Sequence, residues 1–284
     1  MTQFVITGAT GQLGRLVIDV LLRRVPADSI VAAVRNIDKA SDIAALGVQV
    51  RQADYNQPAS LEAAFEGADR LLLISSSEIG QRTRQHQAVI DAAKRSGIQL
   101  LAYTSVLHAD TSVLALAQEH RETEAAILES GMPFVLLRNG WYTENYTAGV
   151  ASALSLGAVV GCAGEGRIAS ASRADYAEAA ATILTSDDPA GQIYELAGDS
   201  AYTLSDFAAA ISRQVGKTIN YVNLPEGDYR NALLAAGLPE PLAGLLADSD
   251  TGASQGALFD DGRQLSSLIG RPTTTLESAI MAAL

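Results

Sequence analysis

Residues 7–14 read Thr7-Gly8-Ala9-Thr10-Gly11-Gln12-Leu13-Gly14 and lie between a β-rich run at 4–7 and a helical apolar pattern at 13–22. The first glycine permits a sharp turn out of the strand, the second lets a pyrophosphate approach the main chain, and the third lets the helix pack closely. A tight structural turn is the alternative, but a strand before and a helix after are the context that dinucleotide binding requires. The stretch predicts a dinucleotide site with cofactor contacts from Gly8, Ala9, Thr10, Gly11, Gln12 and Leu13.

Short apolar runs and helical patterns continue to alternate through the first half of the chain. Strands are expected at 30–34, 48–50, 71–74, 100–103 and 134–137, with helices at 37–46, 58–65, 81–95 and 114–129 between them. Such alternation implies right-handed crossovers and a parallel sheet that helices cover on both faces. We therefore predict the α/β class, with a Rossmann fold built on a doubly wound parallel sheet.

The alternation weakens after Gly140, where helical patterns at 173–184, 204–215 and 228–236 mix with strand patterns at 193–196 and 219–222. We predict an NADP-binding Rossmann domain over residues 1–145 and a smaller helix-rich C-terminal lobe over residues 146–284, with a return of the chain to the Rossmann sheet left open. Ligands of open α/β sheets bind at the carboxyl ends of the strands, so the second lobe is expected to bind the substrate.

The composition limits the partners and the location. The 284 residues are 48% hydrophobic and carry a formal net charge of −12, which argues against nucleic acid and anionic membranes as partners. Because no basic leader segment and no apolar run of about 20 residues is present, a cytoplasmic protein is expected. The one cysteine, Cys162, is expected to be a buried apolar residue. A homodimer is left open.

The end of the second predicted strand bears on the choice between NAD and NADP. NAD-binding sites usually place Asp or Glu there, to accept a hydrogen bond from the ribose 2′-hydroxyl. This chain has Arg35, whose guanidinium could donate two charge-assisted hydrogen bonds to a 2′-phosphate. A solvated cation at a strand end is the alternative, and NADP(H) is favoured.

Polar residues also follow the third and fourth predicted strands. Asp54 and Tyr55 come after the third strand, where a carboxylate could accept from the adenine amino group. Ser75, Ser76 and Ser77 come after the fourth, where they could flank the ribose and the pyrophosphate. Small polar residues are also common turn formers, so a purely structural role is the alternative.

These segments together resemble the atypical, NmrA-like branch of the short-chain dehydrogenase/reductase superfamily, and within it the bacterial NADPH:quinone oxidoreductases and the triphenylmethane dye reductases. The resemblance covers almost the whole chain and rests on residues 6–14, 34–36, 53–55, 73–77, 102–105, 137–145 and 173–177. It implies cofactor contacts from Asn139, Gly140, Trp141, Tyr142, Tyr103 and Arg173. It also places Asn145 near the substrate, and Tyr142 and His108 are further candidates for positioning the substrate.

Short-chain dehydrogenases commonly carry Tyr-x-x-x-Lys on the helix after the fifth strand, for proton exchange with the substrate. Here His120 and Glu124 stand at these positions. A carboxylate cannot lower the pKa of a neighbouring group as a lysine does, so oxidation of an unactivated alcohol is not expected. A quinone needs no such pair, because its reduced anion is a stabilised phenolate that water can protonate. Positioning then supplies most of the catalysis.

The three histidines do not show metal-ligand spacing, so no metal is expected. His86 is expected to be a solvated helix residue, and His120 to bond Glu124 one helical turn away. Ser105 has no obvious base partner, so a nucleophilic triad is not expected.

The sequence thus predicts an NADPH-dependent reductase that transfers hydride to quinones or similar electrophilic acceptors. The alternative comes from a different class: a non-catalytic, NADP-sensing regulatory protein of the NmrA type, which would also lack the Tyr-x-x-x-Lys pair. The pocket segment at 139–145 favours the enzyme.

Overall fold

The computed structural model describes residues 2–284, which form two compact units. The first unit comprises residues 2–109, 119–139 and 173–194, and the second comprises residues 110–118, 140–172 and 195–284. The chain therefore passes between the units several times rather than once near residue 145. Residues 173–194 make the return to the first unit that the sequence leaves open.

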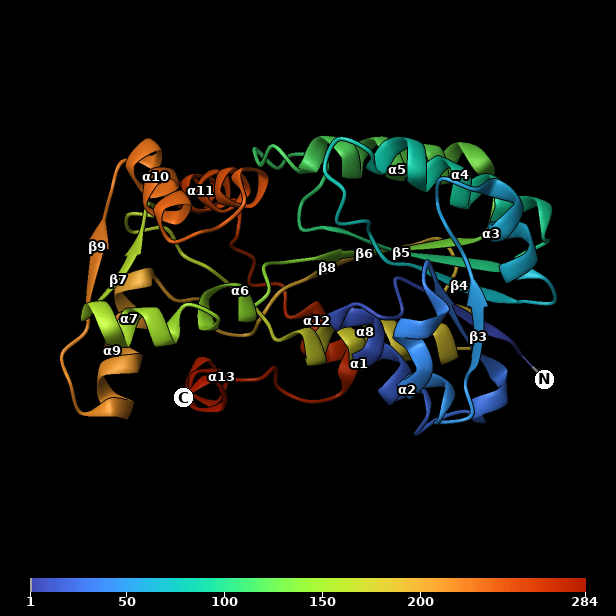
Figure 1. Cartoon of the computed structure of the whole chain (residues 1–284), viewed down its shortest axis with the longest axis horizontal. Helices are drawn as coiled ribbons and strands as arrows, with labels where there is room; N and C mark the ends of the chain where they lie inside the picture. The colour runs from blue at the N-terminus through green and yellow to red at the C-terminus, as the bar shows by residue number, and fades with distance from the viewer. Residues whose placement is uncertain (1) are drawn as a thin grey trace. The chain divides into compact units, whose positions relative to one another are not determined.

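A seven-stranded sheet with the order β3-β2-β1-β4-β5-β6-β8 organises the first unit (Figure 1). The strands are β1 (Phe4–Thr7), β2 (Ile30–Val34), β3 (Gln49–Gln52), β4 (Arg70–Leu73), β5 (Leu100–Val106), β6 (Phe134–Asn139) and β8 (Gln192–Leu196). All pairings among β1 to β6 are parallel. The predicted α/β class and doubly wound Rossmann sheet are confirmed.

Helices cover both faces of this sheet. Figure 1 shows α3 (Pro58–Phe65), α4 (Arg82–Arg95) and α5 (Ala117–Ser130) on one face, and α1 (Gln12–Leu21) and α8 (Arg173–Thr185) on the other. On the first face, Leu71 and Leu101 of the sheet join Leu61, Ile90 and Ile127 of the helices in one buried apolar cluster. Burial of each such side chain stabilises the fold by about 1.5–3 kcal/mol.

Three predicted elements differ from the structure in form or in placement. The helix expected at 37–46 is two short pieces, a 3₁₀ turn η2 (Ile37–Ala40) and α2 (Ser41–Ala44), because the Asn36 side chain caps the N–H of Asp38 and the chain bends at Ala40. A further 3₁₀ turn, η1 (Ala27–Ser29), precedes β2. The segments α8 and β8 were expected in the second lobe, but α8 packs against α1 and β8 joins the sheet beside β6.

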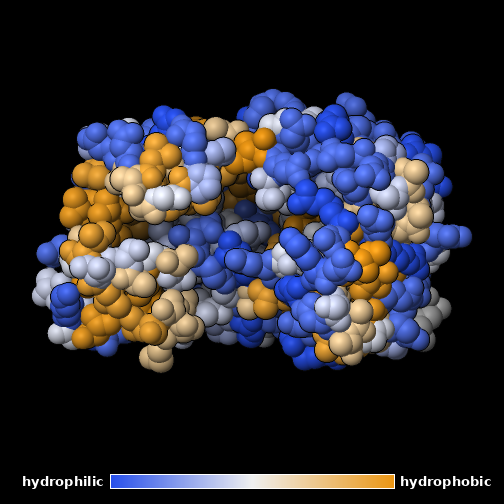
Figure 2. Space-filling view, viewed as in Figure 1, coloured by the Kyte–Doolittle hydropathy of each residue, from blue (hydrophilic) through white to orange (hydrophobic). Residues whose placement is uncertain are grey.

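The second unit is mostly helical. Its helices are α6 (Glu144–Thr147), α7 (Val150–Leu156), α9 (Leu204–Val215), α10 (Glu226–Ala235), α11 (Glu240–Ser254), α12 (Gln264–Ile269) and α13 (Leu276–Ala283). Its two strands, β7 (Ala158–Gly161) and β9 (Asn220–Asn223), pair in parallel. Figure 2 shows apolar residues gathered on its surface over α7 and β9, where Leu156 and Val222 are exposed.

Two expectations from composition can be compared with the structure. Cys162 is buried, as predicted, and burial raises the pKa of its thiol to about 11. No helix within residues 2–284 is long and apolar enough to cross a membrane.

Asp250 of α11 is a buried carboxylate in the second unit, with 3% of its surface exposed. Its Oδ1 accepts from the hydroxyl of Tyr146 at 3.0 Å, and its Oδ2 accepts from the N–H of Cys162 at 2.9 Å. Loss of solvation raises its pKa to about 6, although both hydrogen bonds act in the opposite direction. The folded carboxyl therefore holds its proton more tightly than the unfolded one.

Asp250→Asn is expected to change how stability depends on pH. The contribution of Asp250 to the stability of wild type is lost as the pH rises from about 4 to about 6, because the folded state must release a proton that it binds more tightly. The uncharged variant lacks this loss. Its free energy of unfolding, taken relative to wild type, should therefore increase by about 2–3 kcal/mol over this range. Urea unfolding at several pH values measures the difference, and a constant difference would contradict the raised pKa.

Candidate functional site

The glycine turn joins β1 to α1 with the geometry that phosphate binding needs. Gly8 has a φ of 59°, in the left-handed region, and the N–H of Gly11 donates to its carbonyl at 2.9 Å. A Cβ on Gly14 would lie 2.4 Å from the Gly8 oxygen and 2.8 Å from the Ala9 Cα, so only glycine lets the helix pack this closely. Gly11 caps α1 without a side-chain hydrogen bond, which leaves first-turn N–H groups available to an anion.

Gly14→Ala is expected to disrupt this turn, because the atoms that the new methyl group meets belong to the main chain and cannot move aside. We expect the affinity for NADP(H) to fall by at least about tenfold, with a lower melting temperature. Gly227→Ala on α10 is the matched control, since its Cβ would meet nothing within 4 Å. The control should stabilise its helix by up to about 1 kcal/mol. Calorimetric titration and thermal denaturation give both quantities, and wild-type affinity in Gly14→Ala would refute the packing argument.

The turn lies where the strand order changes direction, since β1 has β2 on one side and β4 on the other. Open α/β sheets bind their ligands at this point. Thr7 links the carboxyl ends of β1 and β4 by hydrogen bonds. Its Oγ1 donates to Leu72 O at 3.1 Å and accepts from the N–H of Ile74 at 3.0 Å. The segments after β1, β2, β3 and β4 thus meet at one sheet edge, and they carry the predicted residues Arg35, Asp54, Tyr55, Ser75, Ser76 and Ser77.

Arg35 follows β2 directly, and its side chain is 65% exposed. Its Nη1 forms an ion pair with Oε1 of Glu78 at 2.5 Å. Gln85 of α4 holds Glu78 from the other side, through Nε2 to Oε2 at 2.7 Å. The sequence predicts that Arg35 belongs to the cofactor site but does not predict its contact with Glu78. No local pattern connects the end of β2 with a turn 43 residues later.

Asp54 shapes the turn after β3. Its Oδ1 accepts from the N–H of Asn56 at 2.9 Å, and its own N–H donates to Oγ of Ser60 at 2.9 Å. Tyr55 donates its hydroxyl to Ile74 O at 3.4 Å, and burial raises its pKa to about 12. The other carboxylate oxygen of Asp54, Oδ2, accepts from Nε2 of Gln57 at 3.4 Å, so both oxygens serve the turn. Contacts of Asp54 or Tyr55 with adenine stay a prediction.

His86 of α4 is fully buried and fixes the segment after β4. Its Nε2 accepts from the N–H of Ser76 at 3.0 Å, so its Nδ1 carries the proton and donates to Oγ1 of Thr123 at 2.9 Å. The Thr123 hydroxyl in turn donates to Glu119 O. Burial, and then the nearby Arg82 cation, lower the pKa of His86 to about 3. The prediction that His86 is solvated is wrong.

Two predicted cofactor residues carry buried polar atoms that form no hydrogen bond within residues 2–284. They are Oγ of Ser75, just after β4, and Oδ1 of Asn139, the last residue of β6. A buried polar atom left unpaired costs about 1–3 kcal/mol, so such atoms commonly mark a place where a ligand or a water binds. Together with the open glycine turn, these residues fit the phosphates and ribose of a dinucleotide.

Tyr103 and His120 form a separate buried contact. The Tyr103 side chain lies within the apolar cluster under α3, α4 and α5. Its hydroxyl shares a hydrogen bond of 2.7 Å with Nδ1 of His120. Burial, with the charge of Arg82, lowers the pKa of His120 to about 3, so this ring is neutral. The predicted bond from His120 to Glu124 is wrong, and contact of Tyr103 with the cofactor stays a prediction, to which its enclosed side chain lends no support.

Glu124 is enclosed in a charged cluster. Arg138 of β6 donates through Nε to Oε1 at 3.0 Å and through Nη2 to Oε2 at 2.7 Å, and both side chains are less than 10% exposed. The hydroxyl of Ser105 also donates to Oε1. Glu124 therefore has no free oxygen for proton exchange, and Ser105 is committed to it. The sequence analysis missed this ion pair, although a charged residue, Arg138, at the end of an apolar strand indicated that a buried partner was needed.

The remaining pocket residues, Gly140, Trp141, Tyr142 and Asn145, belong to the second unit. Main-chain hydrogen bonds hold this segment against Ala171, whose N–H donates to Trp141 O at 3.2 Å and whose carbonyl accepts from the N–H of Thr143 at 2.9 Å. The N–H of Asn145 donates to Tyr142 O, which leads into α6. Roles for Tyr142 and Asn145 toward a substrate stay predictions.

A small cavity of about 100 Å³ lies beside this segment in the second unit. It is lined by Thr143, Ser170, Asp199, Ser200, Tyr202, Pro272, Thr273, Thr274, Thr275 and Leu276. Ligand sites for molecules of drug size usually enclose about 300–1,000 Å³, and this cavity is smaller than that range.

Two further residues that were predicted to contact the substrate or the cofactor, His108 and Arg173, belong to the first unit. His108 follows β5 with a φ of 52°. Arg173 begins α8 and so belongs to the first unit, not to the second lobe as expected. Within residues 2–284, no three His, Cys, Asp or Glu side chains gather closely enough to hold a metal ion.

Comparisons with known proteins point to one family. Residues 8–187 match a family model described as NAD(P)H-binding. The chain is 57% identical over 275 residues to quinone oxidoreductase 2 of Escherichia coli K12, covering 97% of this chain and 96% of the relative. A crystal structure of the NADPH-dependent quinone oxidoreductase of E. coli with NADPH has a TM-score of 0.96 at 56% identity, over 99% of both chains. The Citrobacter sp. triphenylmethane reductase with NADP(H) has a TM-score of 0.95 at 39% identity, over 99% of this chain and 100% of that one.

The negative transcriptional regulator NmrA, solved with NAD, shares the fold alone, with a TM-score of 0.76 at 17% identity over 98% of this chain and 94% of that one. The reductases are therefore much more similar to this chain than the regulator is. The resemblance inferred from the sequence is confirmed. The chain belongs to the NAD(P)H-binding family and, over almost its whole length, is similar to a bacterial quinone oxidoreductase and a triphenylmethane reductase.

Proposed function

We propose that this protein is an NADPH-dependent reductase that transfers hydride to quinones or similar electrophilic acceptors. The observation that carries the proposal is the state of the two positions where short-chain dehydrogenases hold their catalytic pair. Glu124 is closed in an ion pair with Arg138, and His120 is buried and neutral. A site without an activated proton donor suits an acceptor whose reduced form is already a stable anion. The similarity to the E. coli quinone oxidoreductase supports the same function.

The chain's own residues would bind and orient the reactants. The turn from Gly8 to Leu13 would hold the pyrophosphate on the N–H groups of α1, and Arg35 would bind the 2′-phosphate. Ser75 and Asn139 offer their unpaired oxygens on the ribose side. When bound, NADPH supplies the hydride. The quinone oxygen that gains negative charge would take its proton from water. The segment from Asn139 to Asn145 would orient the reactants, and contacts of Arg173 with the cofactor and of His108 with the substrate stay predictions.

The test is NADPH oxidation by the purified protein with p-benzoquinone, followed by the near-ultraviolet absorbance of the reduced cofactor, with NADH in parallel. Saturable turnover that is lost in Gly14→Ala supports the reductase. Tight binding of NADPH without turnover of quinones or cationic dyes would instead favour the NADP-sensing regulator.

We further propose that the protein acts in the cytoplasm and retain the homodimer as a prediction. Leu128 on α5 is 51% exposed, and a helix pair formed between two copies through α4 and α5 would cover it. Light scattering of the purified protein tests the oligomeric state.

A further inference from the structure

Arg35 and Glu78 place opposite charges together at the sheet edge expected to receive the adenosine ribose. The two side chains have opposite preferences for the group on the ribose 2′ position. A guanidinium favours a 2′-phosphate, whereas a carboxylate accepts from a 2′-hydroxyl and repels a phosphate. Dinucleotide sites usually carry one of these two groups. Here both are present, and Nη1 of Arg35 lies 2.5 Å from Oε1 of Glu78.

The position of Glu78 is set by the protein and not by Arg35 alone. Its Oε2 accepts from Gln85, which is 2% exposed, and its N–H donates to Oγ of Ser76 at 3.2 Å. Ser76 is itself fixed, because its N–H donates to the buried His86. Arg35 is 65% exposed and Glu78 is 37% exposed, so a ligand has access to both side chains.

We propose that Glu78 is a specificity-determining residue that limits the preference of this site for NADPH over NADH. The inference rests on the proposed binding of NADPH. A 2′-phosphate bound by Arg35 would come close to the fixed Glu78 carboxylate, and the two negative charges repel each other. A 2′-hydroxyl causes no such repulsion and can donate to the same carboxylate. Glu78 therefore weakens NADPH binding and supports NADH binding, so the site accepts both cofactors.

Glu78→Gln tests this with little change in shape. The new amide can still accept from Arg35. Gln85 can turn its own amide to accept from the new N–H, because its Oε1 is buried without a partner in the described residues. We expect the dissociation constant of NADPH to fall by about five- to tenfold and that of NADH to stay equal or rise. The gain for NADPH should shrink as salt is added. Arg35→Gln should have the opposite effect: the dissociation constant of NADPH should rise and that of NADH should stay unchanged.

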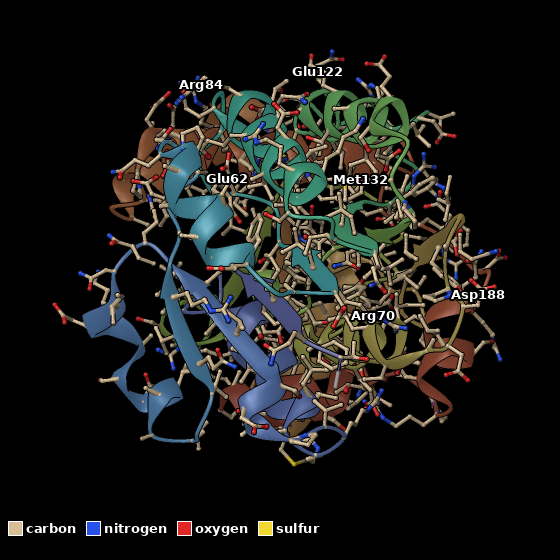
Figure 3. The ribbon with its side chains drawn as sticks, turned by 90° about the vertical axis from the view of Figure 1, so that its right-hand side faces the viewer. Glu62, Arg70, Arg84, Glu122, Met132 and Asp188 are labelled. Atoms are coloured by element: carbon tan, nitrogen blue, oxygen red, sulfur yellow. The ribbon has the colours of Figure 1, made fainter. Side chains whose placement is uncertain are left out.

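Glu62→Gln is the matched control. Glu62 of α3 forms a similarly exposed ion pair with Arg95, the last residue of α4, at 2.7 Å. It lies on the side of the first unit shown in Figure 3, which also shows Arg70 at the amino-terminal start of β4. Because the carboxyl ends of the strands lie at the opposite edge, neither dissociation constant should change.

Isothermal titration of wild type and the three variants with NADPH and with NADH gives all eight affinities without turnover. If Glu78→Gln leaves the ratio of the two dissociation constants as in wild type, the inference is overturned while the proposed function stands. If wild type binds neither cofactor, both fail. A ratio that shifts equally in Glu62→Gln also overturns the inference, because it would then report net charge rather than this contact.

Discussion

Arg138→Met is expected to lower the free energy of unfolding by about 3–5 kcal/mol, because it leaves the Glu124 carboxylate buried without its cation. The guanidinium donates to both carboxylate oxygens, and the two side chains are 9% and 7% exposed. The variant retains only the hydroxyl of Ser105 as a donor to Glu124. One neutral donor cannot replace the solvation that burial removes from a carboxylate.

Arg95→Met is the matched control for this effect. It removes an arginine from an ion pair with Glu62 whose side chains are 52% and 48% exposed, and such pairs contribute about 0–1 kcal/mol. The double variant Arg138→Met with Glu124→Gln should recover much of the loss, since no charge then stays buried. Urea unfolding of the four proteins gives the values. A loss in Arg138→Met no larger than that in Arg95→Met would show that Glu124 is solvated or neutral in the folded state.

The same cluster explains how this Rossmann fold can lack the proton-transfer pair that short-chain dehydrogenases commonly carry. Glu124 and His120 occupy the two helix positions, but each pairs inward, with Arg138 and with Tyr103. These positions thus contribute to the core of the first unit. What the site retains is the glycine turn and the polar strand ends, which we propose bind and orient a dinucleotide. Reduction of an acceptor that needs only orientation is consistent with this loss.

Local rules were enough to predict the glycine turn, the strands of the sheet and the position of Arg35 at a strand end. The glycine turn needs only its spacing and its flanking elements, and the buried strands show as short apolar runs such as that at 71–74. The place of Arg35 at the sheet edge could also be predicted, because the residue directly follows a strand. These features depend on residues near one another in the chain.

Features that depend on distant partners could not be predicted. His86 is a polar residue on a helix, and its burial depends on Ser76 and Thr123, which other segments supply. The same holds for Glu78, which meets Arg35 across 43 residues. The assignment of α8 to the first unit depends on its packing against α1, which no periodicity in residues 173–184 reveals.

Acidification is expected to destabilise the first unit through His86 and His120. Both rings are neutral and buried, with pKa values lowered to about 3, whereas an unfolded histidine titrates near 6.5. Between these values the unfolded state binds protons that the folded state does not, so stability falls as the pH falls. Two such groups give a slope of about 3 kcal/mol per pH unit between about pH 5 and pH 6, where most carboxylates are still ionised.

Measurement in the Asp250→Asn background isolates this slope, because Asp250 titrates in the same range with the opposite sign. Adding His120→Asn keeps a hydrogen-bond partner for the Tyr103 hydroxyl. It should halve the slope of the free energy of unfolding against pH, to the value expected for one proton. A slope unchanged by this substitution would exclude His120 as a source. A proton on Nε2 of His86 cannot coexist with the hydrogen bond from Ser76, but folded His86 takes up that proton only near its lowered pKa of about 3. Between pH 5 and pH 6 the folded protein therefore keeps the segment that holds Glu78 opposite Arg35. Affinity for NADH, whose 2′-hydroxyl does not titrate in this range, should stay constant while stability falls, and an affinity that falls with stability would show that His86 is protonated in the folded state.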